Sequence, residues 1–157
     1  MSSRPAILFV CLGNICRSPL AEAAFRAEAE RAGLDASCDS AGTAAYHVGK
    51  APDPRSIATA AAQGIDIRHY AARQIETRDF VRFTHILAMD HQNRADLVDR
   101  APADATARIG LLMDVVPGRE GAAIADPYYG GEENFVDTWD DATAAAKALV
   151  AKLQVEA

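Results

Sequence analysis

The sequence predicts an α/β fold, a three-layer sandwich with a central parallel sheet and helices on both faces. Apolar runs at residues 7–10, 85–89 and 107–112 have the length and composition of strands buried on both sides. Longer segments between them are rich in alanine and show helical spacing. Strands that alternate with helices favour parallel pairing through right-handed crossovers. The chain is long enough for one core, so we expect a single domain over residues 1–157.

The first strand and the first helix flank a short loop. After residues 7–10, a loop of mixed polarity leads to a helix over residues 18–32. Ser18 has the chemistry of an N-cap, and Pro19 suits the first helical position because its missing N–H is not needed there. Gly33 is a stop signal for this helix.

The next segment combines a short strand, a loop and a helix. Residues 36–40 predict the second strand, and residues 44–54 form a loop because they contain prolines and a glycine without periodicity. Asp53 and Pro54 mark the start of a helix, and Gly64 marks its end.

The second half of the chain continues the alternation. A helical stretch near residues 77–80 precedes the third strand at 85–89, and residues 91–98 predict the following helix. Residues 107–112 form the fourth strand, and residues 115–125 are expected to be a loop.

The last helix is expected over residues 134–155. Its apolar residues recur at helical spacing and form one face. They are Phe135, Trp139, Ala142, Ala146, Leu149 and Leu153. This stripe indicates core packing.

The loop between the first strand and the first helix predicts an anion-binding site. In a strand–loop–helix turn, backbone N–H groups and the positive end of the helix point to one place. Cys11 opens this loop and Arg17 closes it. The positive field stabilises a thiolate at Cys11, and the planar guanidinium of Arg17 matches two phosphate oxygens. These groups indicate phosphoryl transfer through a phosphocysteine. The expected phosphate-binding residues are Leu12, Gly13, Asn14, Ile15, Cys16, Arg17 and Ser18.

Two motifs resemble those of a known family. The segment 10–19, Val-Cys-Leu-Gly-Asn-Ile-Cys-Arg-Ser-Pro, resembles the signature of the low-molecular-weight protein tyrosine phosphatases, and Asp126-Pro-Tyr-Tyr-Gly130 resembles their general-acid loop. The likeness extends from Ile7 to the last helix. It implies a four-stranded parallel sheet in the order 2-1-3-4, and hydrolysis of phosphotyrosine and small aryl phosphates without a cofactor. The implied partners are phosphotyrosine-containing proteins or peptides, with phosphate, sulfate or vanadate as active-site anions.

Asp126 is the candidate general acid. It would protonate the departing phenolate, which contributes about 10²–10⁴-fold to the rate, and would then activate water against the phosphocysteine. Ser18 is expected to donate a hydrogen bond to the sulfur of Cys11. Cys16 is either a small buried apolar residue or a redox partner that forms a reversible disulfide with oxidised Cys11.

The resemblance implies that Ser40, His69 and Asp90 support the loop. The hydroxyl of Ser40 would hold Asn14, which suits a left-handed backbone position; otherwise Ser40 is an ordinary turn residue. His69 would hydrogen-bond to the Asn14 network, although a purely structural histidine is the commoner case. Asp90 follows the third strand, where it can support the loop and also cap the next helix.

The resemblance also implies an apolar substrate cleft. Its walls would be Leu12, Ile15, Tyr46, Tyr128 and Tyr129; without that role, the paired tyrosines are packing residues. A flat ring in the wall can stack on a phosphotyrosine ring. A deep slot would exclude phosphoserine, whose side chain is too short to reach the nucleophile.

Composition excludes some classes of partner. The net charge is −6 and residues 120–141 carry no Lys or Arg, which argues against nucleic acid as a substrate. No run of about 18 apolar residues and no signal-peptide core are present, so we expect a cytoplasmic protein without membrane contact, with unconventional secretion left open. Three cysteines and four scattered histidines lack zinc-ligand spacing, so no metal is expected. We expect a monomer that self-associates at most weakly.

Three other functions fit part of this pattern. An arsenate reductase on the same scaffold also uses a Cys-x5-Arg loop, but it needs further cysteines to relay a disulfide, and none follows Cys38. In the phosphoarginine phosphatase branch, threonine stands in the place of Ile15. A non-catalytic phosphopeptide-binding module would not need both Cys11 and Asp126.

Overall fold

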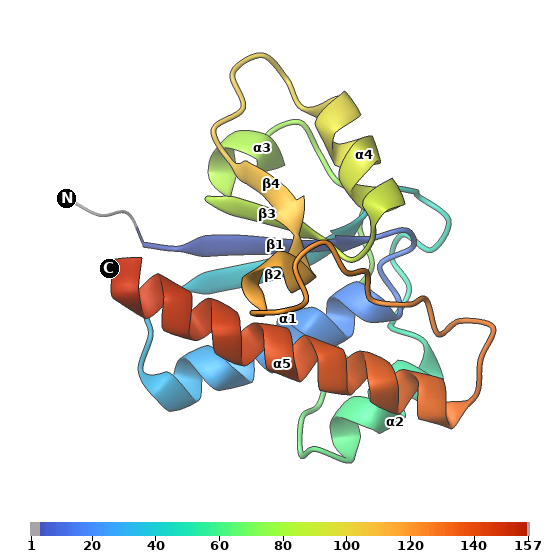
Figure 1. The fold of residues 1–157 in the computed structure, drawn as a ribbon. Helices are drawn as coiled ribbons and strands as arrows, with labels where there is room; N and C mark the ends of the chain where they lie inside the picture. The colour runs from blue at the N-terminus through green and yellow to red at the C-terminus, as the bar shows by residue number, and fades with distance from the viewer. Residues whose placement is uncertain (1–3, 157) are drawn as a thin grey trace.

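The computed structural model describes residues 4–156 and contains a central four-stranded sheet (Figure 1). The strands are β1 (Ala6–Cys11), β2 (Ser37–Gly42), β3 (His85–Ala88) and β4 (Arg108–Leu111). Neighbouring strands pair in parallel, and their order is β2-β1-β3-β4. This confirms the α/β fold and the strand order that the family resemblance implies.

Helices cover both faces of the sheet (Figure 1). They are α1 (Arg17–Ala32), α2 (Pro54–Ala61), α3 (Asp79–Arg82), α4 (His91–Arg100), the 3₁₀ helix η1 (Leu112–Val115) and α5 (Glu132–Glu156). Helices α1, α2 and α5 lie on one side, and α3 and α4 lie on the other. Within residues 4–156, no helix has the length and apolar character needed to cross a bilayer.

The residues of β1 alternate between two apolar cores. Ile7, Phe9 and Cys11 belong to the core beneath α1 and α5, whereas Leu8 and Val10 belong to the core beneath α3 and α4. Successive side chains of a strand point to opposite faces, and helices cover both faces of this sheet. All five side chains are therefore at most 3% exposed. A central parallel strand therefore needs an uninterrupted apolar run, which made β1 recognisable in the sequence.

Several helix signals act as expected. Gly33 follows α1 with a φ of 70°, and Gly64 follows α2 with a φ of 78°. Asp53 caps α2, since its side chain accepts a hydrogen bond from the Arg55 N–H at 2.8 Å. The six apolar residues predicted to form the core-facing stripe of α5 are all buried.

The structure differs from the predicted elements in two places. Ser18 does not cap α1, which already begins at Arg17. The Ser18 side chain is buried, and its Oγ lies 3.1 Å from the sulfur of Cys11, so the hydroxyl is engaged elsewhere. The helix η1 was not expected; it forms because Leu112 and Met113 turn into the core beneath α5 directly after β4.

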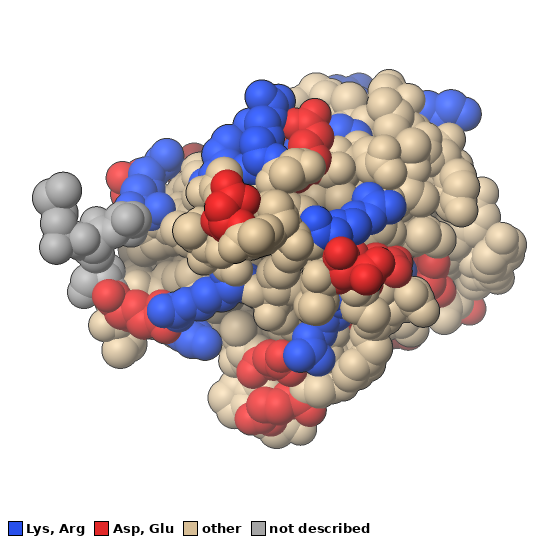
Figure 2. All heavy atoms as spheres, turned by 90° about the horizontal axis from the view of Figure 1, so that it is seen from above, with Lys and Arg blue, Asp and Glu red and all other residues tan. Residues whose placement is uncertain are grey.

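Charged side chains are dispersed over the surface. On the face shown in Figure 2, Lys and Arg alternate with Asp and Glu. Surface ion pairs of this kind join Arg4 to Asp35 at 2.8 Å and Arg78 to Glu76 at 2.7 Å. Such exposed pairs contribute little to stability, so the apolar cores hold the fold together.

We expect Phe25→Ala to lower the free energy of unfolding by about 3–5 kcal/mol, because it leaves a cavity in the core. Phe25 is 1% exposed, and its ring centroid lies 5.6 Å from that of Phe9. Val155→Ala, at a position that is 86% exposed, is the control and should change stability by less than about 0.5 kcal/mol. Urea unfolding measures both, and similar losses would contradict this description of the core.

Candidate active site

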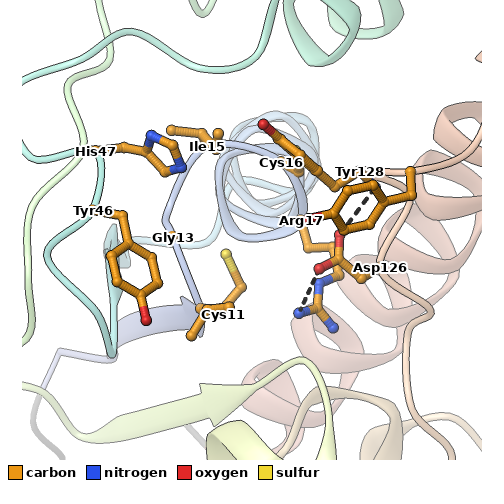
Figure 3. A pocket seen from close by; sticks show the side chains of 11 residues that line it. Cys11, Gly13, Ile15, Cys16, Arg17, Tyr46, His47, Asp126 and Tyr128 are labelled. Carbon is orange, nitrogen blue, oxygen red and sulfur yellow. Dashed lines mark hydrogen bonds and ion pairs between the residues drawn. The ribbon is translucent and has the colours of Figure 1, made fainter.

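The cysteine loop, residues 11–17, curls around a sulfur atom at the carboxyl end of β1 (Figure 3). The backbone N–H of Asn14 donates to Cys11 Sγ with an N···S distance of 3.3 Å. Ser18 Oγ lies 3.1 Å from the same sulfur. Cys11 is only 3% exposed. Two hydrogen-bonding groups therefore converge on one buried sulfur, as the strand–loop–helix pattern predicts.

Asn14 makes the sharp turn of this loop. Its φ is 58°, and it is the one non-glycine residue with a positive φ in the described part of the chain. Asparagine tolerates this left-handed conformation better than most residues. Its Nδ2 donates to Ser18 Oγ at 2.8 Å and to Ser40 Oγ at 3.0 Å, and its Oδ1 accepts from the Arg73 N–H at 3.0 Å. The contact between Ser40 and Asn14 is the one that the resemblance implies.

Arg17 is held at the end of the loop by Asp90. The Arg17 side chain is 3% exposed, and its Nη1 donates to Asp90 Oδ2 at 2.7 Å and to the Ile124 carbonyl at 2.9 Å. Asp90 Oδ1 also accepts from the Asn93 N–H at 2.8 Å, so this carboxylate caps α4 as well. Arg17 Nε is buried without a hydrogen-bond partner among residues 4–156. Because an unpaired buried donor is costly, this N–H is suited to donate a hydrogen bond to a bound anion.

The Asp126 loop, residues 126–131, brings a carboxylate to the same place (Figure 3). Asp126 Oδ2 lies 3.8 Å from Arg17 Nη2, and its Oδ1 accepts from the Tyr128 N–H at 3.1 Å. The Asp126 side chain is 47% exposed. It is therefore accessible both to a ligand at Arg17 and to water.

A cavity of about 320 Å³ opens between the two loops (Figure 3). It is lined by Cys11, Leu12, Gly13, Ile15, Cys16, Arg17, Tyr46, His47, Asp126, Tyr128 and Tyr129. The five residues expected to form the substrate cleft are all among them. Tyr46 and Tyr129 are 73% and 96% exposed, so aromatic side chains form the outer part of the wall.

Comparisons with known proteins agree with this geometry. Residues 6–157 match the family described as low molecular weight phosphotyrosine protein phosphatase. The chain belongs to this family. A relative of that name from Schizosaccharomyces pombe is 43% identical over 142 residues, which cover 88% of this chain and 90% of the relative.

Two solved structures share the fold of this phosphatase. A protein tyrosine phosphatase from Entamoeba histolytica, crystallised with Hepes in its active site, has a TM-score of 0.90 at 36% identity and covers 97% of this chain and 98% of that one. A drosophila arginine phosphatase has a TM-score of 0.89 at 30% identity, with 94% and 97% covered. Proteins named for different substrates thus have the same architecture.

The prediction for His69 is wrong. His69 is exposed and lies edge-on to the ring of Tyr70, with 4.9 Å between centroids. No hydrogen bond joins it to Asn14 within the described residues. Ser40 Oγ instead donates to Glu22 Oε1 at 2.7 Å. Neighbouring side chains in this turn point in different directions. His69 therefore faces solvent, while the next residue, Tyr70, contacts the hydrogen-bond network.

The network behind the cysteine loop continues from Glu22 to Tyr70. Glu22 Oε2 accepts from Arg26 Nη2 at 2.6 Å, and Arg26 in turn hydrogen-bonds to the Tyr70 hydroxyl. Burial raises the pKa of Glu22, although the hydrogen bond from Ser40 and the charge of Arg26 act to lower it. Burial also raises the pKa of Tyr70 to about 12. Tyr70, the neighbour of His69, therefore stands at the outer end of the network.

Two further contacts of the loop were missed in the sequence. Arg73, whose N–H holds Asn14, is itself fixed by Asp79 at 2.9 Å and by Asp39 at 3.1 Å. His47 packs so closely on Gly13 that a Cβ there would lie 3.0 Å from His47 Cδ2. An arginine or histidine in a loop gives no local signal of such distant contacts.

Cys16 is a buried free thiol in the cysteine loop. Burial raises its pKa to about 12, and the Asp53 carboxylate acts in the same direction. Burial likewise raises the pKa of Cys38 to about 11. Both thiols are therefore protonated at neutral pH. Among the described residues, no group of His, Cys, Asp or Glu is arranged to hold a metal ion.

Proposed function

We propose that this phosphatase hydrolyses phosphotyrosine and small aryl phosphates through a phosphocysteine on Cys11. The observation that carries the proposal is the buried Nε of Arg17, unpaired within residues 4–156, in the loop that directs an N–H to the Cys11 sulfur. Loop N–H groups and a planar guanidinium match the oxygens of a phosphate dianion. Phosphate, sulfate or vanadate would occupy the same position.

In the first step the Cys11 thiolate attacks phosphorus in line with the departing phenolate. Arg17 and the loop N–H groups hold the equatorial oxygens, while Asp126 gives its proton to the phenolate oxygen. The P–O bond breaks, the phenol leaves, and the phosphoryl group stays on sulfur. Because the parent phenol has a pKa of about 10, this proton transfer contributes about 10²–10⁴-fold.

In the second step Asp126 acts as a base. Its carboxylate accepts a proton from water as the water oxygen attacks phosphorus, the S–P bond breaks, and phosphate leaves. Cys11 returns to the thiolate. The Ser18 hydroxyl, 3.1 Å from the sulfur, supports this departure by donating a hydrogen bond to the developing negative charge.

The shape of the cavity supports an aryl substrate. Its walls include Leu12 and Ile15 from the cysteine loop and three tyrosines, which suit a flat ring. Ile15 has no hydroxyl, so the position that carries threonine in the phosphoarginine branch is apolar here. Phosphotyrosine-containing proteins or peptides are therefore the favoured partners.

We expect Cys11→Ser to abolish turnover of aryl phosphates, because the nucleophile is lost. Asp126→Ala should lower kcat/KM for phenyl phosphate by about 10²–10³-fold, and for p-nitrophenyl phosphate by less, because a more acidic phenol needs less proton donation. Steady-state kinetics with both substrates test this. An active Cys11→Ser variant, or a wild-type protein without aryl phosphatase activity, would contradict the proposed function.

Matched peptides test the substrate class. We expect kcat/KM for a phosphotyrosine peptide to exceed that for the corresponding phosphoserine peptide by about 100-fold or more, because the shorter side chain cannot bring its phosphate to Cys11. A phosphoarginine peptide is the third arm, since a drosophila arginine phosphatase shares this fold. Preference for phosphoarginine would favour that second candidate function.

We also propose that Cys16 protects Cys11 from over-oxidation. Peroxide converts Cys11 to a sulfenic acid; the Cys16 sulfur then attacks, a disulfide forms, and water leaves. Because the pKa of Cys16 is about 12, its thiolate fraction increases about tenfold per pH unit below that value.

We therefore expect the disulfide to form about tenfold faster at pH 8 than at pH 7 after a brief peroxide pulse. Mass spectrometry of quenched samples measures the link. Cys16→Ser is the control, in which a larger share of the inactivation should be irreversible by thiol, because the sulfenic acid of Cys11 cannot form the disulfide and oxidises further. Reversible inactivation of wild type without a Cys11–Cys16 link would rule out this role.

A further inference from the structure

The Asp126 loop has few hydrogen bonds of its own. The Tyr128 N–H donates to the Asp126 side chain at 3.1 Å, and the Gly130 N–H donates to the Pro127 carbonyl at 2.8 Å. Both bonds are local, and most of the loop is exposed. Local bonds fix the shape of the loop but not its distance from Cys11.

Arg55 joins this loop to another part of the molecule. Its Nη2 donates to the Tyr128 carbonyl at 2.9 Å, and its Nη1 donates to the Gly130 carbonyl at 3.2 Å. The guanidinium also lies over the ring of Phe135, 4.5 Å from its centroid, at the start of α5. In the described chain, two side chains from outside the loop hydrogen-bond to the backbone of residues 126–131. Asn134, at the start of α5, accepts from the Gly131 N–H at 2.9 Å, and Arg55 is the one from a distant part of the sequence.

Asp53 holds Arg55 in this orientation. Asp53 Oδ1 accepts from Arg55 Nε at 3.0 Å, and Asp53 Oδ2 lies 3.0 Å from Nη2. The backbone N–H of Asp53 donates to the Ile15 carbonyl at 2.8 Å. The next turn adds a bond from Ser56 Oγ to the Cys16 carbonyl at 3.4 Å. The beginning of α2 is thus attached to the cysteine loop on one side and to the Asp126 loop on the other.

We propose that Arg55 is a positioning residue that sets the place of Asp126 relative to Cys11. The proposal rests on the proposed function, because it acts through Asp126 as the general acid. A guanidinium can donate from two nitrogens to two carbonyls while a third nitrogen binds Asp53, which the single ammonium of lysine cannot do. Without Arg55 the loop keeps its local bonds, including that to Asn134, and loses its attachment to α2. Anion binding by the cysteine loop does not depend on that attachment.

The first test measures kcat/KM for aryl phosphates whose phenols differ in acidity. We expect Arg55→Ala to lower kcat/KM for phenyl phosphate by about tenfold, and for p-nitrophenyl phosphate by less than about threefold, as displacement of a general acid requires. Arg55→Lys should show the same dependence on the leaving group. Equal losses for all substrates, or wild-type kinetics in Arg55→Lys, would overturn the proposal.

Arg68→Ala is the matched control. Arg68 has the same local arrangement, with Nε donating to Asp66 Oδ1 at 3.0 Å and Nη2 to Asp66 Oδ2 at 2.9 Å. It lies on a different turn and makes no hydrogen bond to the Asp126 loop among the described residues. Its kinetics should match wild type, and a loss like that of Arg55→Ala would overturn the proposal.

A double-mutant cycle separates positioning from substrate binding. In the Asp126→Ala background, Arg55→Ala should cause less than about a twofold further loss, because the group it positions is absent. The affinity for vanadate should stay at the wild-type value in Arg55→Ala. A further tenfold loss of kcat/KM in the Asp126→Ala variant, or weakened vanadate binding in Arg55→Ala, would show that Arg55 does not act through Asp126. An inactive wild type refutes the proposed function, whereas an active wild type with an unaffected Arg55→Ala variant refutes the role of Arg55 alone.

Discussion

The site depends on one backbone turn, made by Asn14. Its left-handed conformation directs an N–H to the Cys11 sulfur, and its side chain holds that conformation through bonds to Ser18, Ser40 and the Arg73 backbone. An unusual conformation persists only when its surroundings determine it from several sides. A short strand, a helix and a distant loop supply these bonds, so the shape of the anion site is a property of the whole fold.

The positive groups of the site lie close together, although the chain as a whole has a net negative charge. Arg17 is buried, but its charge is matched by Asp90 at 2.7 Å, and such buried pairs are costly to break. In the proposed reaction, the loop N–H groups and Arg17 Nε are the donors for an incoming dianion. Recognition therefore depends on oriented donors at fixed positions, and an acidic protein can bind a phosphate ester without a basic surface.

Features encoded by neighbouring residues were predictable from the sequence, and contacts between residues far apart in the chain were not. The apolar run of β1, the stop at Gly33 and the residues from Cys11 to Arg17 are each read from neighbouring positions. The bond from Arg73 to Asn14 spans 59 residues, and that from Arg55 to Tyr128 spans 73, with no pattern that links the partners. His69 is the clearest example of this limit. The segment was identified, but its neighbour Tyr70 makes the contact to the network, because orientation within a short turn depends on tertiary packing.

The two halves of the cavity differ in how firmly their backbones are held. Cys11 ends a strand that is paired on both sides and buried in both cores, whereas the Asp126 loop is mostly exposed and is joined to α2 through Arg55. We therefore expect substitutions in residues 126–131 to leave the backbone of the cysteine loop intact while they change the opposite wall of the cavity. Because Ile15 of the cysteine loop also lines the cavity, the cavity wall is shared between a firmly held backbone and one that can vary in sequence.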